Sequence, residues 1–241
     1  MNSRFIFKAV IALLLSGGAV AAQTVDEIVN KHVDAMGGAA KLAQLKSVRI
    51  AADMEVMNMQ VPVTTTIVQD KGFRSETTVQ GMTIIQSVNG NTGWAMNPMS
   101  GDTKAVALPE EAVKALSAET DLTGLYNYKQ KGYVLTLEGE DEVQGAKVYK
   151  VSMTVKGGIK RINYISKDTF YILKIVSAGN MGGQEITTEN VQSNFKQIDG
   201  ITFAFTSEVK NSMMPGATML AKIKSVEVNS KIDESIFQMP K

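Results

Sequence analysis

The sequence predicts a mainly β fold of the α+β class: a curled antiparallel sheet forming a half-open, unclosed β-barrel covered by N-terminal and central helices. First, from Val48 onward, apolar and polar residues alternate in about a dozen short segments. Second, glycine, asparagine and aspartate residues separate these segments at the spacing of an antiparallel meander. Third, helical periodicity is confined to residues 24–45 and 109–132. A sheet of so many strands must curl, and its inner face must be covered.

The first expected helix begins at a capping box, with Thr24 as the N-cap and Glu27 three residues later. Apolar residues then recur on one face, at Val25, Ile28, Val29, Val33 and Met36. Two glycines at positions 37 and 38 end this helix, and residues 39–45 read as a second, shorter one.

The first expected strand alternates most clearly, with Val48, Ile50, Ala52, Met54 and Val56 on one face. Further strands are expected on both sides of the central helical segment. Before it they are Val61–Asp70, Phe73–Gln80, Met82–Val88, Gly93–Asn97 and Thr103–Leu108. After it they are Tyr133–Asp141, Ala146–Val155, Ile159–Ser166, Phe170–Ala178, Gln184–Phe195, Ile201–Lys210 and Met219–Val228.

The central helical segment opens at Pro109, which suits a first helical turn, as do the acidic residues Glu110 and Glu111. Val113 and Leu116 lie on one side of it, and a glycine at position 132 ends it. No linker rich in proline, serine or glycine divides the chain after this segment. We therefore expect residues 23–241 to form a single domain.

The first 22 residues read as a secretory signal peptide. Arg4 and Lys8 give a basic start, residues 9–15 are an apolar run, and residues 19–22 are small, as a signal peptidase requires. We expect cleavage there and a mature protein that is soluble in the periplasm. No later segment approaches the run of about 20 apolar residues that spans a bilayer, so the mature chain should not be membrane-spanning.

Composition excludes several functions. Without Arg4 and Lys8, basic and acidic residues nearly balance, which argues against a nucleic-acid partner. The chain has no cysteine, so it has no disulfide, no cysteine nucleophile and no lipid-modified cysteine to anchor it.

Catalytic chemistry finds little support in the sequence. His32 is the only histidine, and no Gly-x-Ser-x-Gly motif accompanies it. Zinc sites usually need several histidine or cysteine ligands. We therefore predict that the protein is not an enzyme, that it has neither cofactor nor metal, and that His32 is structural.

The positive signal is the choice of apolar side chains. The chain has 14 methionines, and this flexible side chain adapts to ligands of irregular shape. Curled sheets of this size commonly enclose a cavity for an apolar ligand. The residues predicted to line the hydrophobic cavity and its lid are Val25, Ile28, Val29, Ile50, Met54, Val56, Ile84, Trp94, Met96, Met153, Phe203 and Phe205. Each of them would also suit an ordinary packed core.

Four short motifs, in order, carry a resemblance to a known family. The most specific is Asn89–Pro98, NGNTGWAMNP, which resembles an Asp-Gly-Lys-x-x-Trp-x-Tyr-x-Pro hairpin. The others are Gly72–Glu76 (GFRSE), the tail Asp233–Pro240 with its Phe-x-x-Pro, and the opening Lys31–Gly38. By the order and spacing of these motifs, the chain resembles the LolA-like family of periplasmic lipoprotein carriers, also called outer-membrane lipoprotein-sorting proteins. The resemblance covers nearly all of the mature chain.

The resemblance implies an unclosed barrel whose hydrophobic cavity takes up acyl chains beneath a helical lid. It implies a carrier, expected here to be a monomer, that holds a lipidated protein or other lipid and exchanges it with donor and acceptor proteins of the envelope. The family's lid is held by an arginine that precedes a proline; at that place this chain has Asp70 and Lys71, and no proline. The alternative is a non-catalytic interaction or sensor protein of the envelope with the same fold and a filled core.

Overall fold

The computed structural model describes residues 23–56, 59–155 and 158–241. The signal peptide predicted over residues 1–22 lies outside the described residues. Within them, the strands form one 13-stranded sheet, in the order β6-β5-β4-β3-β2-β1-β13-β12-β11-β10-β9-β8-β7. Neighbouring strands in this sheet pair antiparallel.

The observed strands agree with the expected ones to within a few residues. Those before the central helical segment are β1 (Ser47–Val56), β2 (Met59–Val68), β3 (Gly72–Val79), β4 (Met82–Asn89), β5 (Thr92–Asn97) and β6 (Asp102–Ala107). Those after it are β7 (Leu135–Val143), β8 (Ala146–Thr154), β9 (Lys160–Ser166), β10 (Ile172–Met181), β11 (Gln184–Ile198), β12 (Ile201–Asn211) and β13 (Met219–Val228).

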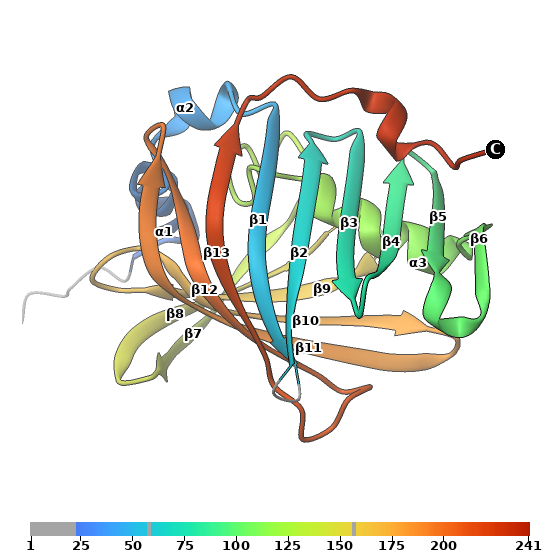
Figure 1. Cartoon of the computed structure of the whole chain (residues 1–241). Helices are drawn as coiled ribbons and strands as arrows, with labels where there is room; N and C mark the ends of the chain where they lie inside the picture. The colour runs from blue at the N-terminus through green and yellow to red at the C-terminus, as the bar shows by residue number, and fades with distance from the viewer. Residues whose placement is uncertain (1–22, 57–58, 156–157) are drawn as a thin grey trace, which may run out of the picture.

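The sheet consists of two meanders joined at a single seam. Strands β1–β6 follow one another outward in one direction and β13–β7 in the other, and β1 pairs with β13 where they meet. In Figure 1, β1–β4 stand upright while β9–β11 lie across them behind, so the sheet curls strongly. Its end strands are β6 and β7, which do not pair with each other. The predicted curled, unclosed antiparallel sheet is confirmed.

The N-terminal helices form as predicted. Helix α1 (Val25–Ala35) begins with the complete capping box, in which the backbone N–H of Thr24 donates to Glu27 at 2.8 Å and that of Glu27 donates to the Thr24 hydroxyl at 3.3 Å. Helix α2 (Ala39–Ala43) follows and ends two residues earlier than expected.

The central segment is less helical than predicted. Helix α3 (Glu110–Ser117) and one 3-10 turn, η2 (Ala118–Thr120), are followed by turns instead of a helix that continues to Gly132. Asp121 is extended, and its carboxylate accepts hydrogen bonds from the backbone and side chain of Thr123 at 3.1 and 3.0 Å. Such local bonds compete with helical ones, which ends the helix. Two further 3-10 turns in the described part of the chain are η1 (Pro98–Ser100) and η4 (Glu234–Phe237).

The main core lies beneath α1. Ile28 is fully buried, and it belongs to a cluster that includes Val48 of β1, Val151 of β8 and Ile165 of β9, each also fully buried. The C-terminal end of α1 docks closely on the turn between β11 and β12. A Cβ at Gly37 would lie 2.3 Å from the carbonyl oxygen of Gly200 in this turn, so only glycine permits the approach.

The C-terminal segment covers the other side of the sheet. Phe237, only 2% exposed, packs on β3 so closely that a Cβ at Gly72 would lie 2.7 Å from its ring. Its carbonyl oxygen accepts hydrogen bonds from the indole N–H of Trp94 at 2.9 Å and from the hydroxyl of Ser87 at 3.3 Å. The Arg74 guanidinium lies 5.3 Å from the Trp94 ring centre. The chain end is therefore an integral part of the fold, as Figure 1 shows.

Replacing Phe237 with alanine should lower the free energy of unfolding by about 3–5 kcal/mol, because it removes a buried aromatic side chain. Met239, two residues later, is 47% exposed. Met239→Ala should therefore change the stability by less than about 0.5 kcal/mol. Urea denaturation of both variants measures the difference; equal effects would show that the tail does not stabilise the sheet.

Candidate functional site

The cross-strand register separates the two faces of the sheet. Val48, Ile67, Phe73 and Val88 lie opposite one another across β1–β4, and Val48 belongs to the core beneath α1. Gly93 continues this row, and a Cβ there would lie 3.0 Å from Val113 of α3. We call the face that carries α1 and α3 the concave face. The adjacent cross-strand row, in which Ser87 of β4 pairs with Trp94 of β5, belongs to the opposite, outer face.

The structure brings together ten of the twelve residues predicted to line the cavity. Val25, Ile28 and Val29 come from α1, and the strand residues among the ten lie on the concave face. These strand residues are Ile50, Met54, Val56, Ile84, Met153, Phe203 and Phe205.

Trp94 and Met96 are the exceptions, because they lie on the outer face. Trp94 pairs with Ser87 and is buried beneath the C-terminal segment, while Met96 pairs with Ile85. The structure therefore separates these two residues from the other ten. Both faces of β5 are covered, one by α3 and the other by the tail, so alternation along this strand could not show which face held the hollow.

The half of the concave face beneath α1 is filled. Ile28, Val29 and Met153 are buried in the main core, and Val25, Ile50 and Phe203 pack against it. No α1 residue lines either of the two hollows described next. A separate pocket of about 370 Å³ between α1 and residues 125–130 is lined by Val29 and Val33 of this helix.

The first hollow on the concave face is a pocket of about 200 Å³ in the middle of the sheet, here called the floor pocket. It is lined by Ile50, Ala52, Met54, Val63, Thr65, Ala204, Ser207, Ala221 and Ile223. Ile50 and Met54 were predicted. The short side chains of Ala52, Ala221 and Ser207 leave the space that longer ones would fill, so this hollow is a direct result of the sequence.

The second hollow is larger, about 600 Å³, and lies between α3 and strands β9–β12; we call it the α3 cleft. On the helix side its walls include Glu111, Lys114, Ala115, Leu116 and Glu119, and on the sheet side Arg161, Ser177, Gly179, Thr188 and Asn211. Its size suits a small-molecule site. None of the predicted cavity residues lines it. The available signal was the amphipathic pattern of residues 110–117.

Polar contacts tie α3 and the turn after it to both walls. On one side, Glu111 accepts a hydrogen bond from the backbone of Gly182 at 2.8 Å, and Glu119 pairs with Arg161 at 2.9 Å. On the other, the Ser117 hydroxyl donates to the carbonyl of Gly90 at 3.1 Å. At the place where the resemblance implies an arginine before a proline, the backbone N–H of Asp70 instead donates to the carbonyl of residue 120 at 3.1 Å.

The segment after α3 is held by a half-buried ion pair. The Lys131 ammonium lies 2.8 Å from each carboxylate oxygen of Asp121. Burial raises the pKa of Asp121, but the bonds from Lys131 and Thr123 outweigh it and leave that pKa below its usual range. Burial, together with the Asp121 and Asp70 charges, raises the pKa of Tyr133 to about 12. These shifts hold both Asp121 and Tyr133 in their ordinary neutral-pH charge states, which suits an anchor better than an acid–base catalyst.

His32 lies in the core on α1, where its ring Nδ1 is 2.8 Å from the carbonyl oxygen of Phe170. Because a carbonyl only accepts, this nitrogen carries the proton. Burial lowers the pKa of His32, and the bond to Phe170 opposes that effect. Among the residues that the structure describes, no three histidine, cysteine or acidic side chains gather closely enough to hold a metal ion.

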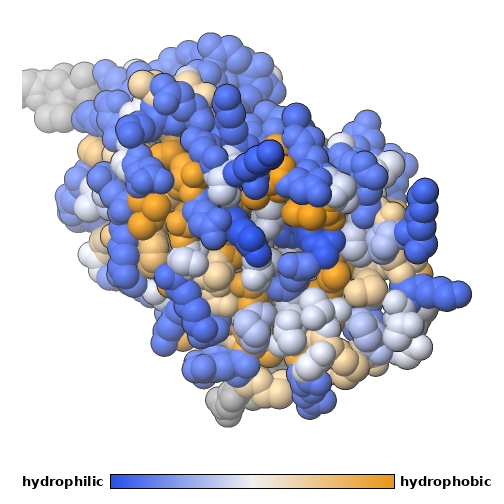
Figure 2. Space-filling view, turned by 45° about the horizontal axis from the view of Figure 1, so that its top comes forward, coloured by the Kyte–Doolittle hydropathy of each residue, from blue (hydrophilic) through white to orange (hydrophobic). Residues whose placement is uncertain are grey.

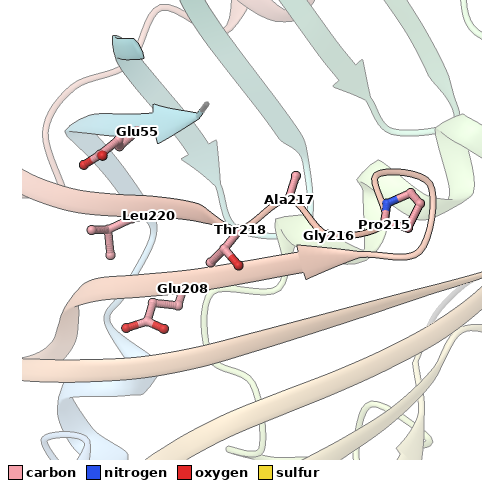
Figure 3. Close-up of a pocket in the computed structure, with 7 residues that line it drawn as sticks. All are labelled: Glu55, Glu208, Pro215, Gly216, Ala217, Thr218 and Leu220. Atoms are coloured by element: carbon pink, nitrogen blue, oxygen red, sulfur yellow. The ribbon is translucent and has the colours of Figure 1, made fainter. Parts of the chain in front are cut away.

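A third hollow, of about 610 Å³, lies on the outer face beside the β12–β13 hairpin. Figure 3 shows Glu55 and Glu208 reaching to the same side, with Leu220 between them on β13. None of the predicted cavity residues lines it. The surface seen in Figure 2 is mostly polar, with apolar side chains in separate patches. We therefore take the two hollows of the concave face as the candidate site.

These features define the class of protein: an open antiparallel sheet that curls around a helix and leaves a ligand-sized hollow between them. A family model with the description "Uncharacterized protein" matches residues 72–241, and the chain belongs to that family. Among curated proteins, no sequence matches it significantly. No helix in the described part of the chain is long and apolar enough to cross a bilayer.

Solved structures show that the fold is LolA-like. A DUF1329 family protein from Desulfovibrio piger superposes with a TM-score of 0.60 at 16% identity, covering 90% of this chain and 98% of that one. A LolA superfamily protein from Nitrosomonas europaea gives 0.58 at 11%, covering 90% and 98%. A domain from Vibrio parahaemolyticus whose name assigns it to outer membrane lipoprotein sorting gives 0.55 at 14%, covering 88% and 94%. The predicted resemblance is thereby confirmed for the fold.

The buried histidine predicts how stability depends on pH. Its pKa is lower in the folded chain than the ordinary 6.5, so the unfolded chain binds a proton at higher pH. The stability that comes from keeping His32 neutral is therefore fully present above about pH 6.5, and it is lost as the pH falls from there through the folded-state pKa. Urea denaturation between about pH 7.5 and 5.5 should show that the free energy of unfolding declines, and that the decline is smaller in His32→Gln. This variant leaves the neighbouring Lys31 and the Phe170 carbonyl in place. An identical decline in both proteins would refute this assignment.

Proposed function

We propose that the mature chain, residues 23–241, is a soluble, monomeric binding protein of the periplasm. It holds a lipoprotein acyl chain or another hydrophobic ligand on the concave face of its sheet and exchanges it with donor and acceptor proteins of the envelope. The signal peptide predicted from residues 1–22 delivers it there. The observation that carries this proposal is the pair of hollows on the concave face, one apolar and the other of ligand size.

The floor pocket offers the apolar part of the site. Ile50, Met54, Val63 and Ile223 surround it, and Met54 can change rotamer to fit chains of different shape. Burial of hydrocarbon here is favourable at about 25 cal/mol per Å² removed from water. Of the predicted residues, Val25, Ile28, Val29, Met153 and Phe203 then serve as the packed base of the site.

The lid in this proposal is α3. Its polar ties to the sheet are few, and the side chains of Glu111 and Glu119 that make two of them are exposed. An ion pair with an exposed carboxylate contributes about 0–1 kcal/mol, and a single hydrogen bond about 0.5–1.5 kcal/mol, so both contacts can break without unfolding the sheet. The LolA-like neighbours support a carrier, because one of them is named for lipoprotein sorting.

The alternative is a non-catalytic sensor or interaction protein of the envelope. The packed core beneath α1 favours it, because Ile28, Val48 and Ile165 are fully buried there. Organic extraction of the purified protein, followed by mass spectrometry, separates the two: a carrier should release lipid. A clean extract, together with no uptake of a fluorescent fatty acid, would favour the alternative.

Two neighbouring alanines offer a matched test of the site. Ala52 lines the floor pocket, whereas Ala51 points to the outer face. Ala52→Phe should fill the pocket and weaken binding of a fluorescent fatty acid at least about tenfold. Ala51→Phe adds the same side chain on the other face and should leave the affinity within about twofold. If both variants bind like the unmodified protein, the floor pocket is not the site.

A further inference from the structure

One wall of the concave face is polar. Across β9–β12, one cross-strand row consists of Arg161, Ser177, Thr188 and Asn211, and these residues line the α3 cleft. The next row contains Asn163 and Asn190, and the one after it Gln192 and Ser207. We call these eight residues the polar wall. A site for hydrocarbon alone would not be expected to carry them, since burying polar groups without partners costs free energy.

Two atoms on the polar wall lack partners. Among the residues that the structure describes, three buried side-chain nitrogen or oxygen atoms have no hydrogen-bond partner: Arg161 Nε, Asn190 Oδ1 and Ser230 Oγ. The first two belong to the polar wall. Buried polar atoms in folded proteins are nearly always paired, so a donor and an acceptor left open on one wall call for a ligand or water.

The charges of the α3 cleft balance one another. The Arg161 guanidinium pairs through Nη2 with Glu119 at 2.9 Å, and Lys114 pairs with Glu110 at 2.6 Å. Glu111, also in the cleft, accepts the backbone N–H of Gly182. The cleft lining thus carries two acidic and two basic side chains. The lining therefore offers an ionic head group no excess of opposite charge. An uncharged head group does not need such an excess.

Asn190 lies between the two hollows. Along β11 it is two residues from Thr188, which lines the α3 cleft. Across the sheet it pairs with Val209, which is two residues from Ser207 of the floor pocket. A ligand that reaches from one hollow to the other would therefore cross the row that contains this amide.

We propose that the ligand is an acylated polyol, an amphiphile with an uncharged head rich in hydroxyl groups. A hydroxyl both accepts and donates, so a head with several hydroxyls offers an acceptor for Arg161 Nε and a donor for Asn190 Oδ1. The head occupies the α3 cleft and the chain extends over the floor pocket. This inference rests on the proposed function and narrows it to one ligand class; an acylglycerol and a glycolipid share the required chemistry.

Displacement of a fluorescent fatty acid from the full mature protein tests the head group with four probes of equal chain length. They are monopalmitoylglycerol, hexadecyl glucoside, palmitate and hexadecyltrimethylammonium. At least one uncharged probe should bind about tenfold more tightly than either ion. The stronger of the two uncharged probes then tells an acylglycerol from a glycolipid. Equal affinities, or tighter binding of palmitate, would overturn the head-group inference alone. If no probe binds, the proposed function itself fails.

Variants locate the head group. Asn190→Leu keeps the side-chain size and removes the amide, so it should weaken the preferred uncharged probe about tenfold and leave palmitate unchanged. Thr188→Val, in the adjacent row, should act in the same direction and serves if Asn190→Leu folds poorly. Thr206→Val makes a matched change on the outer face of β12 and should have no effect. Unchanged or improved affinity in both wall variants would show that water fills the open positions.

Discussion

The pairing of β1 with β13 is the constraint on which the rest of the structure depends. It joins Ser47–Val56 near the start of the described chain to Met219–Val228 near its end. Because each half of the sheet is a simple meander, this seam sends β6 and β7 to opposite edges. The 108–134 connection therefore has to cross the whole width of a curled sheet. It does so over the concave face, which explains why a helix lies inside the curve.

That crossing divides the concave face into parts with different roles. Beneath α1, large apolar side chains meet and fill the space, as Ile28, Val48 and Ile165 do. Toward α3, the short side chains of several alanines and of Ser207 leave the floor pocket, and the polar wall faces the helix. An apolar base and a hydrogen-bonding wall on one surface are the arrangement that an amphiphile needs. The same sheet thus supplies both the rigidity and the site.

Local patterns in the sequence predicted most of the fold, and they failed where the answer depends on distant segments. Alternation located the strands, and Thr24 with Glu27 located the start of α1. Alternation also shows that a strand has two faces, but only its register with a neighbour shows which face is concave, so it could not separate Trp94 and Met96 from the residues of the concave face. Arg161 was missed because a lone arginine in a strand looks like a surface residue. Its burial comes from Glu119 and α3, which are distant in sequence.

The two helices on the concave face differ in how firmly they are held, and this difference decides which of them can act as a lid. Helix α1 buries Ile28, Val29, His32 and Val33, whereas α3 buries Val113 alone. Moving α1 would expose three buried apolar side chains, each worth about 1.5–3 kcal/mol. Moving α3 breaks mainly exposed polar contacts, which water replaces at little cost. Local opening begins where buried apolar contacts are fewest, so access to the concave face is expected at α3 while α1 stays in place.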